Sequence, residues 1–513
     1  MSTMSMRTAA LTLATLFSAP SEAFWRMPCP GRLVQERIDP IVDPGEVSGH
    51  VHTVSGGSGF GFETSFEQQR QSACSSCPVK PDLSVYWTPK LYFMDQDGHF
   101  EDVPQAGEGE GVTGGMTVYY EQRGGPDNDK LKAFPPGFRM LAGESSARNA
   151  TDAEAAPGRA VSYACLDYTG PAREQTENMP DYNCPNGLRA QIFFPSCWDG
   201  VHNDTEDHKS HMAYPIGRYD NGRCPDSHPH HLISIFYEVI YQTDLFADRW
   251  WGDQQPFVFA QGDRTGYGFH GDFVNGWEVD VLQDAVDNCL SDSGNIADCP
   301  VFANDLFTDE ECQACRLPTQ IDEQTTGNLT SLPGCNPPTS SSDEDVAPSS
   351  CSTPAISSPT QYFSNMIQSV GWEYQGCASD DIASRTLTGG FTWSDDMTVQ
   401  HCIDYCKGEG FSLAGLEYAN QCYCGNDYAN QDAAPNPDIL GNCWQPCAGN
   451  DQEVCGGSAA LSVYKSCDDG ACSNAVFHVN GTDSASSSSS AGGSSEKRKR
   501  HIHKHAHGHA KFH

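Results

Sequence analysis

Residues 232–241 read Leu-Ile-Ser-Ile-Phe-Tyr-Glu-Val-Ile-Tyr, a run dominated by β-branched and aromatic side chains. Such a run is typical of a central strand that is buried in a sheet. Shorter runs of this kind begin at Ser84 and Met116, and clusters of Gly, Pro and Asp separate them, as expected between strands. Residues 279–290 instead repeat apolar side chains at helical spacing, which predicts a helix. The sequence therefore predicts a β-rich, sandwich-like domain with long loops over residues 24–318.

Three further segments follow this domain. Residues 319–360 are dominated by Gly, Pro, Ser, Thr and acidic side chains without a core-forming pattern, so a disordered linker is expected. Residues 371–464 form a compact region that is rich in cysteine. Residues 484–513 begin with a serine-rich tract and end in a basic, histidine-rich tail, which could bind transition metals, acidic polysaccharide or the acidic body of the protein.

The N-terminus has the pattern of a secretory signal peptide over residues 1–23. Arg7 supplies the positive charge, a short apolar core follows, and Ser21 and Ala23 place small residues before a cleavage site at Phe24. The apolar core is much shorter than the ~20 residues that span a bilayer. No later segment is apolar enough either, so we expect no transmembrane anchor.

The cysteine content also indicates an oxidising compartment. The chain has 23 cysteines, and disulfides persist in secreted proteins. The count is odd, so one thiol is left over or pairs between chains. Four Asn-x-Ser/Thr sequons provide candidate N-glycosylation sites, namely Asn149, Asn203, Asn328 and Asn480. We therefore expect a secreted glycoprotein that is located outside the cell or in the cell wall.

The net charge excludes one class of partner. The formal charge is −38, and the basic tail means that the rest of the chain is more acidic still. A body this acidic repels phosphate backbones, so nucleic acid is not an expected partner. Neutral glycans and cations remain compatible with this charge.

The cysteine-rich region carries an even set of cysteines: Cys377, Cys402, Cys406, Cys422, Cys424, Cys443, Cys447 and Cys455. Eight cysteines in such a short segment indicate four disulfides, whose pairing is not deducible from the spacing. Zinc is the alternative, because two of the pairs have ligand-like spacing, but secretion favours disulfides. In the N-terminal domain, Cys74-Ser-Ser-Cys77 and Cys312-Gln-Ala-Cys315 predict two local disulfides.

The motifs of this region carry a family resemblance. Tyr374-Gln-Gly-Cys377, Gln421-Cys-Tyr-Cys-Gly425 and Cys455-Gly-Gly457, in register with all eight cysteines, resemble a WSC domain. The resemblance implies a small disulfide-rich α+β module that binds cell-wall polysaccharide, with β-glucan as the usual ligand. Sugar rings stack on aromatic side chains, and we expect some of the candidates to be structural instead. The candidates are Trp372, Tyr374, Tyr418, Tyr423 and Trp444.

The N-terminal domain also resembles a known family. The motifs are Phe24-Trp-Arg-Met-Pro-Cys29, Ser48-Gly-His-Val-His52, Phe194-Pro-Ser-Cys-Trp-Asp-Gly200 and His270-Gly-Asp-Phe-Val-Asn-Gly-Trp277. They are similar to the fungal secreted domain of unknown function nineteen-ninety-six. The resemblance implies an association with WSC modules and with fungal extracellular proteins, but it brings no activity.

A metal site is one hypothesis for this domain. His50 and His52 are two residues apart, so on a strand both imidazoles would point to one face. A third ligand would come from His211, His270 or Asp272. Imidazole suits zinc or copper, whereas a set of carboxylates would suit calcium or magnesium. We therefore consider a divalent metal, zinc or copper, as the candidate cofactor.

Acid–base chemistry on a polysaccharide is the second hypothesis. A glycosidase needs two carboxylates about 5–10 Å apart, and Asp199 and Asp272 lie in aromatic and Gly-rich contexts. A lyase would instead need a base such as His211 beside Tyr214. Acidic residues in an acidic protein are more often part of the solvated surface, so whether this domain is an enzyme stays open.

These observations lead to one main functional hypothesis and two alternatives. The main hypothesis is a secreted, cell-wall-directed protein that binds polysaccharide through residues 371–464. The first alternative is a polysaccharide-active hydrolase or lyase in the N-terminal domain, delivered to its substrate by the WSC-like module. The second is a non-enzymatic structural or stress-related wall protein.

Overall fold

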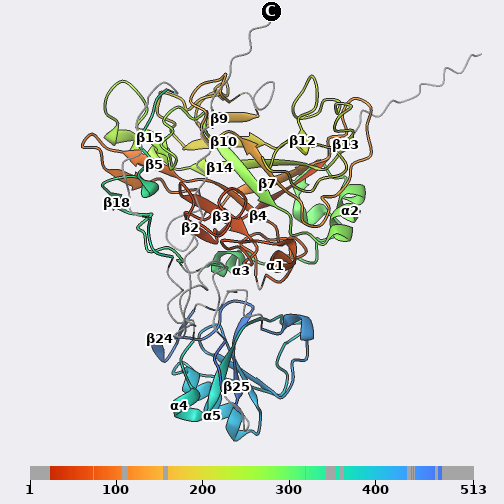
Figure 1. The fold of residues 1–513 in the computed structure, drawn as a ribbon, viewed down its shortest axis with the longest axis vertical. Coiled ribbons are helices and arrows are strands. Elements are labelled where there is room, and N and C mark those ends of the chain that lie inside the picture. The colour runs from red at the N-terminus through yellow and green to blue at the C-terminus, as the bar shows by residue number, and fades with distance from the viewer. Residues whose placement is uncertain are drawn as a thin grey trace, which may run out of the picture.

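The computed structural model describes residues 23–341 except 73, 107–113, 154–159 and 318, then residues 353–356, and residues 363–475 except 436–440, 442, 444 and 468–471. Residues 1–22 of the expected signal peptide, the histidine-rich tail, Asn480 and Trp444 lie outside the described residues. Figure 1 shows a large β-rich N-terminal region and a smaller C-terminal module.

A six-stranded sheet forms one layer of the N-terminal region, in the order β17-β1-β7-β14-β10-β9. The predicted central strand is β14, which lies between β7 and β10 and confirms the expected β-rich fold. The strands of this sheet are β1 (Phe24–Pro28), β7 (Thr117–Glu121), β9 (Val161–Cys165), β10 (Leu188–Phe193), β14 (Ser234–Tyr241) and β17 (Gly294–Asn295).

A five-stranded antiparallel sheet forms the second layer, in the order β2-β3-β4-β16-β8. Tyr86 of β4 packs edge-on against Tyr237 of β14, and its hydroxyl lies 2.8 Å from that of Tyr120 on β7. The two sheets therefore share one core, as in a sandwich. The strands are β2 (Val34–Glu36), β3 (His52–Gly56), β4 (Val85–Pro89), β8 (Arg139–Gly143) and β16 (His270–Val274).

The outer face of this second sheet is also covered. Val54, Trp87 and Val274 belong to a second apolar cluster, which includes Ile38 and Ile41 from the loop before β3. Because side chains alternate along a strand, His52 and His270 share this outer face with Val54 and Val274. The loop thus buries a site on the face of the sheet that points away from the main core.

Shorter elements complete the region. A four-stranded sheet runs β15-β5-β6-β18 and a three-stranded sheet runs β12-β11-β13. The predicted helix at residues 279–290 is α2. The bounds are β5 (Leu91–Met94), β6 (Phe100–Asp102), β11 (Cys197–Trp198), β12 (Met212–Ala213), β13 (His230–His231), β15 (Phe257–Phe259), β18 (Asn328–Leu329), α1 (Phe66–Arg70), α2 (Val279–Asn288) and α3 (Asp309–Ala314).

The structure differs from the expected linker over residues 319–341, which fold back onto the N-terminal region. Leu329 and Leu332 are buried in a cluster with Tyr92 and Val258. Glu36 accepts hydrogen bonds from the backbone N–H groups of residues 320 and 321. A few well-placed apolar side chains and backbone contacts thus fix a segment whose composition alone indicates disorder.

The two predicted local disulfides of the N-terminal region are wrong. Cys77 pairs with Cys29, and Cys74 pairs with Cys315 across 241 residues. The reason is that Cys77 points into the core between the sheets, whereas Cys74 points into the cluster on the outer face. Cys312 is left buried and, among the described cysteines, is the one free thiol. Further disulfides of this region include Cys165–Cys184, Cys197–Cys224 and Cys289–Cys299.

The C-terminal module is a disulfide-rich unit in which one helix packs on a five-stranded sheet, as expected. The helix α5 (Val399–Gly408) begins at Thr398, which caps the His401 N–H. Cys402–Cys422 and Cys406–Cys424 bind this helix to β22, and Cys377–Cys443 and Cys447–Cys455 complete the set. The bounds are α4 (Ile367–Val370), β19 (Trp372–Ser379), β20 (Gly390–Trp393), β21 (Leu413–Glu417), β22 (Gln421–Gly425), β23 (Pro446–Cys447), β24 (Asn450–Val454) and β25 (Ala460–Ser466).

Candidate functional site

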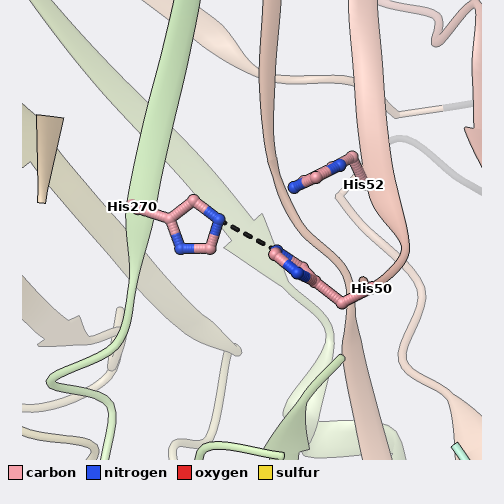
Figure 2. Close-up of side chains that lie close together, drawn as sticks. All are labelled: His50, His52 and His270. Carbon is pink, nitrogen blue, oxygen red and sulfur yellow. Dashed lines mark hydrogen bonds between the residues drawn. The ribbon is translucent and has the colours of Figure 1, made fainter. Parts of the chain in front are cut away.

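Three histidines meet on the outer face of the five-stranded sheet (Figure 2). His52 begins β3 and His270 begins β16, and these strands flank β4 on either side. His52 pairs with Pro89 of β4, and Asp272, two residues after His270, pairs with Trp87. The two histidines therefore reach the same end of β4. His50, from the loop before β3, completes the group, which we call the histidine cluster.

The imidazoles of the histidine cluster converge on one point. One ring nitrogen from each histidine lies within 4.8 Å of the other two. The Nε2 atoms of His50 and His270 are 3.0 Å apart, as the dashed line in Figure 2 marks. The ring centroids of His50 and His52 are 4.3 Å apart. This is the convergence on which the metal hypothesis depends.

Hydrogen bonds to the backbone fix two of the rings. His52 Nδ1 lies 3.1 Å from the Ile38 carbonyl, and His270 Nδ1 lies 2.9 Å from the Gly268 carbonyl. Because a carbonyl oxygen only accepts, each Nδ1 carries the proton. The neutral rings of His52 and His270 therefore present the lone pair of Nε2.

The rings are held neutral. Burial lowers the pKa of both His52 and His270 to about 4. Burial, together with the two neighbouring imidazoles, holds the pKa of His50 well below its usual range. Neutral imidazole is the form that binds metals.

Two buried carboxyl groups accompany the cluster. Asp272 is 1% exposed, and its Oδ2 has no hydrogen-bond partner among the described residues. Burial and the nearby Asp39 raise the pKa of Asp272 well above its usual range. Asp39 accepts hydrogen bonds from the Ile41 and Val42 N–H groups, which orders the loop that covers the site.

The other residues considered for catalysis are engaged in local structure. His211 contacts Thr205 and the Arg139 carbonyl, so the structure does not bring it to the histidine cluster. Tyr214 donates to the Phe193 carbonyl. Asp199 accepts from the His202 ring and from two backbone N–H groups, and these contacts lower its pKa to about 2. Asp272 differs from these residues, because its Oδ2 has no hydrogen-bond partner among the described residues.

The aromatic side chains proposed for sugar stacking fall into two groups. Trp372, Tyr374 and Tyr423 are buried in the C-terminal module, so they are part of its core. Tyr418 is 40% exposed and donates its hydroxyl to Glu310 of the N-terminal region, 3.1 Å away.

Sequence reasoning missed the aromatic residues that are most exposed among the described residues of this module. Phe391 and Trp393 on β20 are 51% and 62% exposed. They are two residues apart on one strand, so their rings lie on the same face of the sheet. The ring of Phe391 packs against that of Tyr423, with a distance of 4.9 Å between the ring centroids. We call Phe391 and Trp393 the aromatic platform. The sequence Phe391-Thr-Trp393, in which two aromatic residues are two positions apart, was the feature from which they could have been predicted.

A hollow of about 400 Å³ lies beside the aromatic platform, between the two parts of the chain. Gln421 connects the two features, because it pairs with Trp393 in the sheet and also lines the hollow. Polar and charged side chains from both parts face this space, including Lys80, Glu310, Arg385 and Glu417.

The comparison with known families agrees with this division. Residues 39–277 match the family described as "Domain of unknown function (DUF1996)", and residues 374–457 match the WSC domain. The chain carries a DUF1996 domain followed by a WSC domain. The histidine cluster lies within the DUF1996 domain, and the aromatic platform lies within the WSC domain.

Several proteins are similar to the chain over one short segment. A "WSC domain-containing protein" of Arthroderma benhamiae is 40% identical over 97 residues, 18% of this chain and 10% of that protein. A "Putative fungistatic metabolite" of Chaetomium globosum is 43% identical over 96 residues, 18% of this chain and 41% of that protein. Human "Kremen protein 2" is 38% identical over 94 residues, 18% of this chain and 20% of that protein. The chain thus covers less than half the length of each relative.

Three observations concern the location of the protein. Among the described residues, no helix is both long and apolar enough to cross a bilayer. Of the candidate glycosylation sites, Asn328 is exposed on β18 and Asn149 and Asn203 are partly exposed. The many disulfides are consistent with a secreted protein.

Proposed function

We propose that the chain is a secreted, cell-wall-directed protein that binds polysaccharide, specifically β-glucan, through its WSC domain. The observation that carries this proposal is the exposed aromatic platform on a domain of this family. Sugar rings present apolar faces, and exposed aromatic rings are the side chains that stack on them. The predicted signal peptide and the disulfides support secretion.

The geometry of the platform suits an extended glycan. Residues two apart on a strand are separated by about 6.6 Å, so both rings can contact one chain of sugars. The hollow beyond Gln421 then offers the amide, carboxylate and guanidinium groups that take sugar hydroxyls. A glycan lying along β20 and into the hollow would thus combine stacking with hydrogen bonding.

Co-sedimentation of the full-length secreted protein with insoluble β-glucan tests the proposal. An aromatic contact contributes about 1 kcal/mol, so Trp393→Ala and Phe391→Ala should each weaken binding about fivefold. Tyr168→Ala is the matched control, because Tyr168 is 75% exposed on the other domain, and it should bind like the wild type. Unchanged binding by both platform variants, or no binding by the wild type, would contradict the proposal.

A second candidate function is chemistry on the bound polysaccharide by the DUF1996 domain. The observation that favours it is the histidine cluster, whose ring nitrogens point at a common centre. The other groups of potential metal ligands among the described residues contain cysteines that are already in disulfides. A metal-dependent enzyme in this domain would therefore depend on the histidine cluster.

A further inference from the structure

We propose that His50, His52 and His270 bind one divalent transition-metal ion, zinc or copper, on the outer face of the five-stranded sheet. Nitrogen ligands of a tetrahedral zinc ion lie ~2.0–2.1 Å from the metal, and hence ~3.3–3.4 Å from one another. The Nε2 atoms of His50 and His270 are 3.0 Å apart, and one nitrogen from each of the three rings lies within 4.8 Å of the other two, so the separations are compatible with this spacing.

The hydrogen bonds of the rings are those of metal ligands. A histidine that binds a metal usually donates its other ring N–H to a backbone carbonyl or a carboxylate, which fixes the ring and its tautomer. His52 and His270 do so to Ile38 and Gly268. Both ordering contacts are therefore in place without any contribution from the metal.

The alternative is that these histidines are ordinary structural residues, and burial argues against it. His52 is 0% exposed, yet its Nε2 has no hydrogen-bond partner among the described residues. A buried polar atom without a partner is destabilising, so an apolar side chain would serve the core better. Asp272 Oδ2, on the same strand face as His270, is a second buried atom without a partner. A bound cation would interact favourably with both atoms, the His52 Nε2 and the Asp272 Oδ2.

The donor set determines the class of ion. Three imidazoles suit zinc and copper, whereas calcium and magnesium prefer sets of oxygen ligands. Three protein ligands also leave a coordination position for water or substrate, as in catalytic zinc sites. His50 is partly exposed whereas His52 and His270 are buried, so the ion is reached from the side of His50.

The experiment compares metal-dependent stability in full-length protein after chelator treatment. An ion that binds only the folded state raises the unfolding temperature, by about 5 °C at a hundredfold excess over Kd for a domain of this size. We expect this rise in wild type with Zn²⁺ or Cu²⁺, and a much smaller one with Ca²⁺. His52→Asn should abolish the rise, because Asn can still donate to the Ile38 carbonyl but offers no Nε2. It should also bind one equivalent less metal in equilibrium dialysis.

Two further variants make the result decisive. His211→Asn is the matched control, because His211 is equally buried in the same domain but lies outside the cluster, and it should keep the full rise. His50→Gln, at a partly exposed position, replaces His52→Asn if that variant does not fold. The histidines of residues 501–513 are common to all variants, so their binding cancels in the comparison. Equal shifts and equal stoichiometry in wild type and cluster variants would overturn the proposal.

Discussion

Replacement of Glu36 by Gln should stabilise the protein at neutral and alkaline pH. Glu36 is 2% exposed, and it accepts hydrogen bonds from the backbone N–H groups of residues 320 and 321. Burial raises its pKa from 4.5 to about 8. A carboxyl group whose pKa is raised by folding favours the folded state only while it is protonated. Its effect on stability is therefore lost progressively as the pH rises from about 4.5 to about 8.

The magnitude follows from the pKa shift. Each pH unit between the two pKa values changes the free energy of unfolding by about 1.4 kcal/mol. The penalty from Glu36 should thus reach about 3 kcal/mol at pH 7 and about 5 kcal/mol above pH 8. Glutamine keeps the accepting oxygen and carries no charge at any pH. Glu36→Gln should therefore match wild type near pH 4.5 and exceed its stability at pH 8 by several kcal/mol.

Urea unfolding followed by tryptophan fluorescence, at intervals from pH 4.5 to pH 9, measures this difference. Glu323→Gln is the matched control, because Glu323 lies on the segment of residues 319–341 that Glu36 of β2 contacts. Its carboxylate pairs with Arg37 at 2.7 Å, so removal of its charge should not stabilise the protein at any pH. If Glu36→Gln were no more stable than wild type at pH 9, Glu36 would be ionised without penalty and the reasoning would fail.

Two further predictions concern the cysteines. Cys312 is buried, and burial raises the pKa of its thiol to about 12. A thiol reagent at pH 8 should therefore leave Cys312 unmodified in the folded protein and label it after denaturation. Labelling of the folded protein would contradict this placement. The Cys402–Cys422 disulfide links residues that are 20 positions apart and connects α5 to β22. The double variant Cys402→Ser/Cys422→Ser should therefore lower the free energy of unfolding of the WSC domain by about 3 kcal/mol, which limited proteolysis would detect as faster cleavage within residues 371–464. Unchanged resistance to proteolysis would show that the other disulfides are sufficient.

The sequence predicts two of the three members of the histidine cluster more firmly than the third. The spacing of two residues predicts that His50 and His52 lie close together, and they do, although His50 lies in the loop before β3 and not on the strand. His270 is 218 residues further along the chain than His52, and it joins them because β4 pairs with both β3 and β16. Strand order of this kind depends on long-range pairing, so His270 could only be one of several candidates.

For the aromatic residues of the WSC domain, the sequence predicts the type of residue that would bind sugar but not its exposure. The composition of this domain supplies several candidate aromatic side chains, and it does not indicate which of them are on the surface. Tyr374 is in the core because it stacks on Phe363 and contacts Tyr464, and neither contact is local in sequence. Phe391 and Trp393 lie on β20 at one edge of the sheet and are exposed, whereas Trp372 and Tyr374 on β19, at the other edge, are buried. Whether an edge strand is covered depends on the packing of the whole module.

The Cys74–Cys315 disulfide has a mechanical consequence for a protein held to a wall through its WSC domain. Tension from a bound glycan would enter the DUF1996 domain along residues 319–341. The first attachments that it meets are the hydrogen bonds of the Thr339 backbone to Gly262 and Arg264, and the two-residue pairing of β18 with β6 follows. Further unravelling would then meet the covalent bond from Cys315 to Cys74, next to α3. The sandwich upstream, with the histidine cluster on its outer face, would then bear load through that bond as well as through the backbone of α3.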